Sequence, residues 1–164
     1  MANVRIATVE DIRGLMDCHT LVWQSLGEVL PADWIQEEID LVHRTEAEEM
    51  LRRVIEDPER ITLVAVEEGK IVGFAMGRSD KSSLSWLSFM GVSSSHRRRG
   101  IGRGLVQKYV EESRLRGARK VSLNTAPELE PAVKLYVDMG FIPEGLLRRH
   151  RYGMDLIVYS KFLG

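Results

Sequence analysis

Apolar residues recur along the chain at two different spacings, and each spacing predicts one type of element. Helical spacing, with apolar positions three and four residues apart, predicts helices at Glu10–Val22, within residues 34–55, at Gly100–Gly117 and at Pro131–Met139. Alternating or β-branched runs predict strands in VRIATVEDI, ITLVAVEEGKIVGFAMGRS, LSWLSFMGVS and KVSLNT, and near Phe141-Ile142 and Leu156–Ser160. Because these elements alternate without a linker or repeat, we expect a single domain over residues 1–164, with an α/β fold in which helices cover both faces of a mixed sheet.

Turn-forming residues predict where several of these elements begin and end. Thr8, with Asp11 three residues later, predicts the start of the first helix. Gly69 predicts a tight hairpin turn. Gly91, inside a strand, predicts a bulge or the close approach of another backbone. The run RRHR at residues 148–151 predicts a solvated turn between the last two strands.

The composition of the 164 residues is that of a globular protein, with 44% hydrophobic and 29% charged residues. No stretch approaches the ~18 uninterrupted apolar residues of a spanning helix, and MANVRIATVEDI lacks the apolar core of a signal peptide. We therefore expect a cytoplasmic protein without a membrane partner. The one cysteine, Cys18, has no partner for a disulfide and no Cys/His spacing around it, so we expect no metal site.

Charge is divided unevenly along the chain, although the formal net charge is only −1. Residues 1–90 hold 9 Lys and Arg against 17 Asp and Glu, whereas residues 91–164 hold 14 against 7. Such asymmetry suits a polyanionic cofactor on the basic side and a cationic substrate on the acidic side, and it would equally suit nucleic acid. The charge alone leaves these alternatives open.

The most informative segment is SSSHRRRGIGRG, which follows a predicted strand and opens a predicted helix. Glycines let consecutive amides turn inward, and a helix N-terminus adds unpaired N–H groups and the positive end of its dipole, so this turn predicts a diphosphate site. Two familiar nucleotide loops do not fit. Leu105 stands where GxGxxG needs its third glycine, and GxxxxGK[ST] has no match.

The pattern that fits is R-x-x-G-x-G, formed by Arg97, Gly100 and Gly102, and here the chain resembles the GNAT superfamily of acetyl-CoA-dependent N-acetyltransferases. The run AVKLYVDMGF resembles the closing helix-to-strand segment of the family, A-x-x-LY-x-x-x-GF, and VRIATVEDI resembles its first strand and helix start. The resemblance follows nearly the whole order of elements and leaves residues 23–58 unassigned. It implies a mostly antiparallel sheet of about six to seven strands with about four helices.

The resemblance also implies roles for individual residues. Backbone groups of Met90, Gly91 and Val92 would pair with the pantetheine arm of acetyl-CoA, and the Met90 amide would stabilise the oxyanion. Tyr136 would protonate the departing sulfur, with simple packing of its ring in the core as the alternative. Asn124 would contact cofactor or substrate, or would only close the end of its strand. The loop that would hold the pyrophosphate comprises Arg97, Arg98, Arg99, Gly100, Ile101, Gly102 and Arg103.

The implied reaction is direct transfer of the acetyl group, in a ternary complex, to a primary amine of a small metabolite, a polyamine-like molecule or a protein. The acidic first half favours a cationic acceptor. No carboxylate lies in Leu84–Val92 to act as the base, and Asn124 stands where protein N-terminal acetyltransferases of the family commonly have a glutamate. Trp23 and Trp34 are expected in the core, with a place in an acceptor pocket as the alternative. The resemblance to the family also implies a possible partner, a second copy of the chain bound through the last strands to form a homodimer.

Two other functions are alternatives. The missing base, together with Leu129 in place of an asparagine that touches CoA in many members, favours an acyl-CoA-binding regulatory module with little turnover. The basic clusters at Arg97–Arg99, Arg114–Lys120 and Arg148–Arg151 would suit nucleic acid. They lack interleaved aromatic residues and a recognised motif, so we expect no nucleic-acid partner. His19 lies on a predicted helix without a convergent partner.

Overall fold

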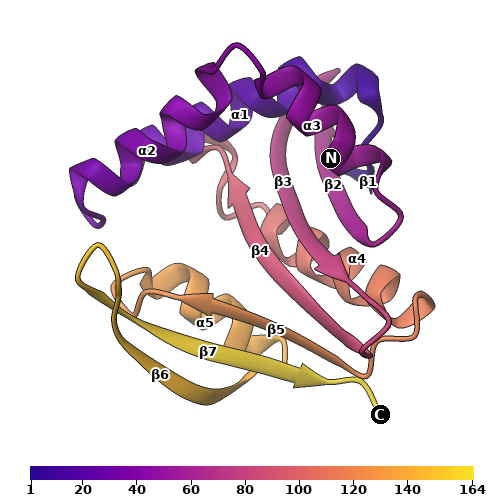
Figure 1. Cartoon of the computed structure of the whole chain (residues 1–164), viewed down its shortest axis with the longest axis vertical. Helices are drawn as coiled ribbons and strands as arrows, with labels where there is room; N and C mark the ends of the chain where they lie inside the picture. The colour runs from indigo at the N-terminus through magenta and orange to yellow at the C-terminus, as the bar shows by residue number, and fades with distance from the viewer.

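One seven-stranded mixed sheet runs through the chain and carries five α-helices (Figure 1). The structure is a computed structural model that describes residues 1–164. The strands are β1 (Asn3–Ile6), β2 (Arg60–Glu67), β3 (Lys70–Ser79), β4 (Leu84–Val92), β5 (Lys120–Thr125), β6 (Ile142–Arg151) and β7 (Met154–Phe162). The helices are α1 (Ile12–Gln24), α2 (Ala32–His43), α3 (Ala47–Glu56), α4 (Ile101–Leu115) and α5 (Glu130–Asp138), with 3-10 turns at Val9–Asp11 and Ser94–His96. None of these helices combines the length and the apolar character that crossing a membrane requires.

The predicted α/β class is confirmed, and the strand order is β1-β2-β3-β4-β5-β7-β6. Every neighbouring pair is antiparallel except β4 and β5. That parallel pair is short, because only Leu84–Trp86 of β4 and Lys120–Ser122 of β5 are in register. Beyond these residues the two strands diverge, as Figure 1 shows, so the sheet opens into a V between β4 and β5.

Both faces of the sheet are covered, and the apolar run of β2 shows why. Side chains alternate between the two faces of a strand. Leu63 and Ala65 belong to the largest buried cluster, which contains side chains of α4 and α5, whereas Val64 packs with Leu15 and Cys18 of α1. A strand that is buried on both faces needs a continuous apolar run, which ITLVAV supplies. In Figure 1, α1, α2 and α3 accordingly cover one side of the sheet, with α4 on the other.

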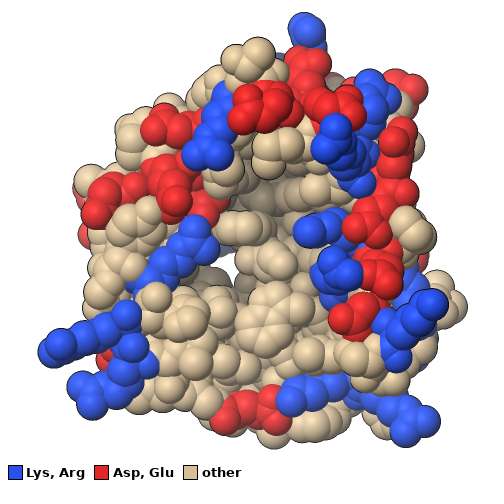
Figure 2. Space-filling model, viewed as in Figure 1, with Lys and Arg blue, Asp and Glu red and all other residues tan.

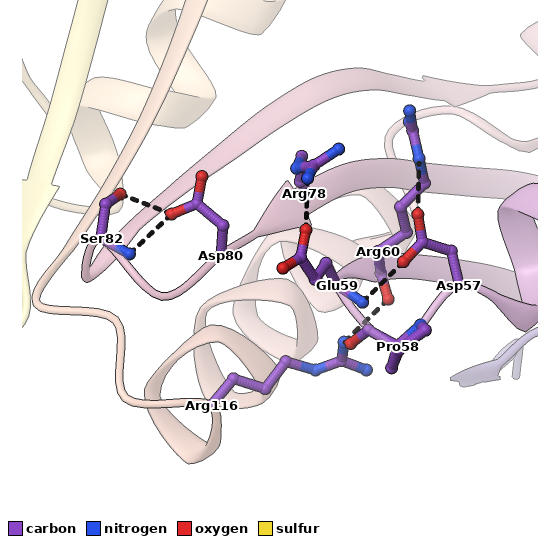
Figure 3. Close-up of polar contacts among 8 residues, drawn as sticks. All are labelled: Asp57, Pro58, Glu59, Arg60, Arg78, Asp80, Ser82 and Arg116. Carbon is purple, nitrogen blue, oxygen red and sulfur yellow. Dashed lines mark hydrogen bonds and ion pairs between the residues drawn. The ribbon is translucent and has the colours of Figure 1, made fainter.

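Polar contacts fasten the end of α4 to the segment that leads into β2 (Figure 3). The Arg116 guanidinium donates to the backbone carbonyls of Pro58 and Arg60 at 2.7 and 2.8 Å. Beside them, Glu59 forms an ion pair with Arg78 of β3. These contacts hold the C-terminal end of α4 along the sheet, while its N-terminal end lies beside the diverging half of β4.

The helix count exceeds the expected number by one because residues 32–56 form both α2 and α3. Two predicted turns are confirmed. The Thr8 amide donates to the Asp11 carboxylate at 2.8 Å where the first helical segment begins. Gly69 lies in the β2–β3 turn with φ +74°, a conformation that glycine adopts without strain.

The expected bulge at Gly91 is wrong. The β3–β4 register shifts at Ser88, which has no partner on β3. A Cβ atom at Gly91 would lie 2.7 Å from a methyl carbon of Val22 in α1. Glycine is therefore required there by a helix side chain that packs against the strand, and not by a backbone irregularity.

The expected solvated turn at residues 148–151 is also wrong, because these residues complete β6. The turn consists of Tyr152 and Gly153, with φ +49° and +76°. A two-residue turn with both φ angles positive matches the twist of a hairpin, although tyrosine is an unusual residue for it. Tyr152 stacks on Trp34 of α2 with ring centroids 5.9 Å apart, so a tertiary contact supports its conformation.

Candidate active site

The closed end of the V is anchored by buried hydroxyl groups. Tyr109 of α4 is fully buried, and its hydroxyl donates to the Trp86 carbonyl at 3.0 Å while accepting from the Ser85 hydroxyl at 3.0 Å. Trp86 is the last residue of β4 that pairs with β5. Burial raises the pKa of Tyr109 to about 12, so the hydroxyl stays protonated and keeps its donor role. The helix that follows the glycine-rich loop is thus tied to β4 where the V opens.

A groove of about 760 Å³ lies along the diverging half of β4. Its walls come from the end of β4, the loop that opens α4, the end of α1 with the turn after it, and the start of α5. Eight of the predicted cofactor-binding residues line it, namely Met90, Gly91, Val92, Arg97, Arg98, Gly100, Gly102 and Arg103. The structure therefore brings the strand and the loop together around one space.

The loop presents unpaired backbone amides at the groove. The first helical bond of α4 joins the Gly104 amide to the Gly100 carbonyl at 3.0 Å. The amides of Ile101, Gly102 and Arg103 consequently have no partner within the helix. Gly100 precedes them with φ +79°, in the left-handed region that favours glycine. Unpaired amides at a helix N-terminus, beside arginine side chains, suit a diphosphate.

The Arg97 side chain bridges the two walls of the groove. It donates to the Val92 carbonyl at 3.0 Å and to the Ser25 hydroxyl, just after α1, at 2.6 Å. Arg97 therefore engages one of the β4 backbone groups that were expected to pair with pantetheine. Its side chain positions the end of α1 against the loop.

The other loop side chains divide into two sets. Arg98 and Arg103 line the groove and take part in none of the ion pairs of the protein, so their charge is available to an anion. Arg99 instead pairs with Glu67 of β2 at 3.2 Å, and the Ile101 side chain is buried in the main core. Neither Arg99 nor Ile101 presents its side chain to the groove.

A second, smaller cavity of about 180 Å³ adjoins the groove. The residues that line both spaces are Val22, Leu26, Met90, Leu129 and Ala132. Tyr136 and Asn124 line the smaller cavity and not the groove. Figure 2 shows the hollow at the centre of the molecule, between α2 and the β6–β7 hairpin, with an opening that passes through. The groove and the cavity thus form one continuous space that meets at Met90.

Comparison with known proteins agrees with this geometry. The family model described as the acetyltransferase (GNAT) family matches residues 18–141. The chain belongs to the GNAT family. N-acetylaspartate synthetase of Xenopus tropicalis is 31% identical over 108 residues, which cover 65% of this chain and 40% of that protein. The chain spans between a quarter and about half the length of these curated relatives, which include a mycothiol acetyltransferase of Corynebacterium glutamicum.

Solved GNAT structures share the fold over the whole chain. The PaiA N-acetyltransferase of Thermoplasma acidophilum, in complex with coenzyme A, superposes with a TM-score of 0.83 at 15% identity and covers 99% of both chains. The ribosomal-protein-alanine N-acetyltransferase of Brucella melitensis has a TM-score of 0.74 at 27% identity, over 98% of this chain and 99% of that one. The seven-stranded sheet is therefore a GNAT sheet.

In this GNAT protein, Tyr136 reaches the smaller cavity from a buried position on α5. Its ring packs against Phe141, with centroids 5.8 Å apart. Gly140, with φ +87°, ends the helix and lets the Phe141 amide donate to the Tyr136 carbonyl at 3.0 Å. Burial raises the pKa of the Tyr136 hydroxyl, so the group carries its proton at neutral pH. Its role as the acid stays a prediction, for which this placement is suitable.

No carboxylate lines the smaller cavity of this GNAT protein; its ionisable lining side chains are Tyr136, His150 and Arg151. The buried carboxylate nearest in the fold, Glu38 of α2, accepts from Arg151 at 2.8 Å. Its other oxygen lies 3.8 Å from Nε2 of His19, beyond hydrogen-bond distance, so the structure places His19 beside a carboxylate that the sequence did not indicate. These two contacts enclose Glu38, whose side chain is only 1% exposed.

Sequence reasoning missed the contribution of residues 23–58 to the site. Side chains from this segment that line the groove or the cavity are Trp23, Ser25, Leu26, Val29, Leu30 and Trp34. The available signal was the spacing of Trp23, Leu26, Leu30 and Trp34, three and four residues apart, which continues a helical stripe across the turn after α1. Trp23 and Trp34 are buried core residues, as expected, and they also line the smaller cavity; their place in an acceptor pocket stays a prediction.

Proposed function

We propose that this chain is an N-acetyltransferase that moves the acetyl group of acetyl-CoA directly to a primary amine within a ternary complex. The observation that carries the proposal is the junction at Met90, where a groove suited to a diphosphate and its pantetheine arm meets a smaller, mostly apolar cavity suited to an amine. Membership of the GNAT family and the acetyltransferase names of several relatives support the same activity.

The cofactor would lie with its diphosphate on the amides of Ile101, Gly102 and Arg103, close to the free guanidinium groups of Arg98 and Arg103. Its pantetheine arm would pair with the free edge of β4, as an added strand pairs with a sheet. Met90 and Gly91 provide that edge, because the Val92 carbonyl is already engaged by Arg97. This arrangement brings the thioester to the junction of the two spaces.

The reaction would proceed at that junction. An uncharged amine attacks the carbonyl carbon from the smaller cavity, and the Met90 amide donates to the oxygen that gains negative charge. The carbon–sulfur bond then breaks, and the Tyr136 hydroxyl gives its proton to the departing sulfur. The proton of the incoming ammonium passes to water or to His150, because no carboxylate is within the cavity.

Cys18 supports direct transfer over a route through an acetylated enzyme. It is the one cysteine of the chain and is 1% exposed. Burial raises the pKa of the Cys18 thiol to about 12, so almost none of it is thiolate at neutral pH. A nucleophilic thiol is therefore lacking at the site.

A thermal melt with and without acetyl-CoA tests the proposal before the amine is known. At about 100-fold above its dissociation constant, a ligand adds about 2.7 kcal/mol of stability, which corresponds to roughly 5–10 °C for a chain of this size. Gly102→Leu should abolish the shift, because the added side chain would project from the helix start beside Leu135 into the groove.

Gly104→Ala is the matched control, since its Cβ would lie 3.5 Å from Val4 and outside the groove. This variant should keep the full shift. A wild-type protein that acetyl-CoA does not stabilise, and that releases no free CoA thiol with any amine, would contradict the proposed activity.

A further inference from the structure

The smaller cavity is apolar and aromatic where it would receive the body of an acceptor. Fifteen of its twenty lining residues are hydrophobic. Trp23 lines it, with its ring 6.0 Å from Phe89 in an edge-on arrangement at 72° and 6.0 Å from Trp34. Tilted and edge-on contacts at such distances are the preferred geometry between aromatic rings. A further ring would therefore find several partners in this wall.

The volume of the cavity sets the size of the group that it can enclose. At about 180 Å³ it slightly exceeds the engineered apolar cavity of about 150 Å³ that binds one benzene molecule. One six-membered ring with a short linker fits such a space. The linker would lead toward Met90, which lies at the junction with the groove.

The charges around the cavity argue against an acceptor with a second positive charge. Arg151 and His150 line it, and no acidic side chain does. The carboxylate of Glu38 is enclosed by Arg151, whose guanidinium also lies 5.2 Å from the centroid of the Trp34 ring. A polyamine would place its distal ammonium in an apolar space beside a guanidinium, without a counter-ion. An acceptor with two positive charges, such as a polyamine, is thus disfavoured.

We propose that the acceptor is a primary amine joined by a short aliphatic chain to a single aromatic ring, as in phenylethylamine. This inference rests on the proposed acetyltransferase function and specifies its substrate class. Trp23, Trp34 and Phe89 hold the ring, and the amine points toward Met90. The ion pair between Arg151 and Glu38 keeps the tip of the β6–β7 hairpin against α2, which closes the cavity.

The experiment compares amines in the release of free CoA thiol from acetyl-CoA. Phenylethylamine should give a kcat/KM at least about tenfold higher than butylamine, putrescine or an alanine-terminated peptide, since one buried ring adds several contacts in the wall. Phenylalanine, which adds a carboxylate, tests whether Arg151 also accepts an anion; a kcat/KM above that of phenylethylamine would overturn the proposed class, in which the amine is the single ionisable group of the acceptor. Turnover of putrescine or the peptide at a higher kcat/KM than phenylethylamine would overturn it as well, while leaving the acetyltransferase function intact.

Two variants and a binding measurement separate the substrate class from the activity. Leu30→Phe fills the cavity from a position outside the groove and should abolish phenylethylamine turnover while the melting shift with acetyl-CoA persists. Leu21→Phe, on the exposed face of α1, is the control. It should change neither the turnover of phenylethylamine nor the melting shift with acetyl-CoA. If Leu30→Phe does not fold, Phe89→Leu, which keeps an apolar side chain, should raise the KM for phenylethylamine severalfold.

Saturable quenching of tryptophan fluorescence by phenylethylamine is expected even without acetyl-CoA, because two tryptophans form the wall. Absence of both quenching and selective turnover would overturn the proposal. Quenching without any thiol release would instead uphold the ring-binding cavity and contradict the acetyltransferase function.

Discussion

The hydroxyl of Tyr136 is the single group on which the departure of the sulfur is proposed to depend. Tyr136→Phe should lower kcat by about 10²-fold, in the range of lost general acid catalysis, with the affinity for acetyl-CoA unchanged. Steady-state kinetics with the best amine measures the first effect, and the melting shift measures the second. The cavity keeps its shape in this variant because the ring and its contact with Phe141 are retained.

Tyr159→Phe is the matched control, because it also removes one tyrosine hydroxyl from the same core cluster. Tyr159 is equally buried but does not line the cavity. It should leave kcat near the wild-type value. Equal losses in both variants would indicate that Tyr136 acts through packing, and a wild-type kcat in Tyr136→Phe would remove it from the mechanism.

At the scale of elements, the joint between β1 and α1 depends on one carboxylate. Asp11 accepts two bonds from the Arg5 guanidinium, at 2.7 and 2.9 Å, and one from the Thr8 amide at 2.8 Å. The Arg5 guanidinium, aided by the amide, holds the pKa of Asp11 below its usual range against the opposing effect of burial. This network attaches an edge strand of only four residues to the first helix.

Asp11→Asn should lower the free energy of unfolding at about pH 7 by about 1–3 kcal/mol, through loss of charged hydrogen bonds. Because the folded pKa is the lower one, this stabilisation is complete above the unfolded pKa of about 3.9 and disappears as the pH falls through the folded value. Urea titrations at about pH 7 and at about pH 2.5 measure the free energy of unfolding of both proteins. The difference between wild type and variant should be smaller at about pH 2.5 than at about pH 7. A difference in the free energy of unfolding that grows in acid would contradict the stabilising role of the ionised Asp11 carboxylate.

The V between β4 and β5 is the element-scale feature that makes the site. Its position follows from where pairing stops at Trp86 and where Tyr109 binds that carbonyl. The unpaired edge of β4 beyond Ser88 then faces the groove rather than β5. If β4 were paired with β5 along its whole length, none of its backbone groups on that edge would be free to bind a ligand.

For the molecule as a whole, the basic second half of the chain supplies three arginines, Arg97, Arg98 and Arg103, to the groove where the cofactor is proposed to bind. Arg98 and Arg103 are free of ion pairs at the groove, whereas many other charges are paired across the surface, as the mixture of red and blue in Figure 2 suggests. Screening acts most strongly on exposed charges. The dissociation constant of acetyl-CoA should therefore rise by roughly 3–10-fold between about 50 and 300 mM salt.

Arg103→Gln should weaken acetyl-CoA binding and flatten this salt dependence, as calorimetric titration at both salt concentrations would measure. Arg114→Gln, near the other end of α4, is the control and should preserve the wild-type slope. A salt dependence that is unchanged in Arg103→Gln would show that the backbone amides carry the binding without this side chain.

Local patterns in the sequence determined the order of the elements, the capping contact of Asp11, the turn at Gly69 and the glycine-rich start of α4. Each of these depends on residues within a few positions of one another, whose spacing and backbone preferences are legible in the chain. The meeting of Met90, Gly100 and Gly102 at one groove was also predicted, but through resemblance to a family and not from spacing alone.

Only the tertiary structure decided the register shift at Ser88, the turn at Tyr152 and the set of side chains that line the smaller cavity. The cavity joins Trp34 of α2 to Arg151 of β6, which are far apart in the chain and meet because the V leaves a space that both elements border. Likewise, Tyr152 adopts its turn because it stacks on Trp34. Contacts between distant segments depend on the packing of the whole sheet and its helices, and no local spacing specifies them.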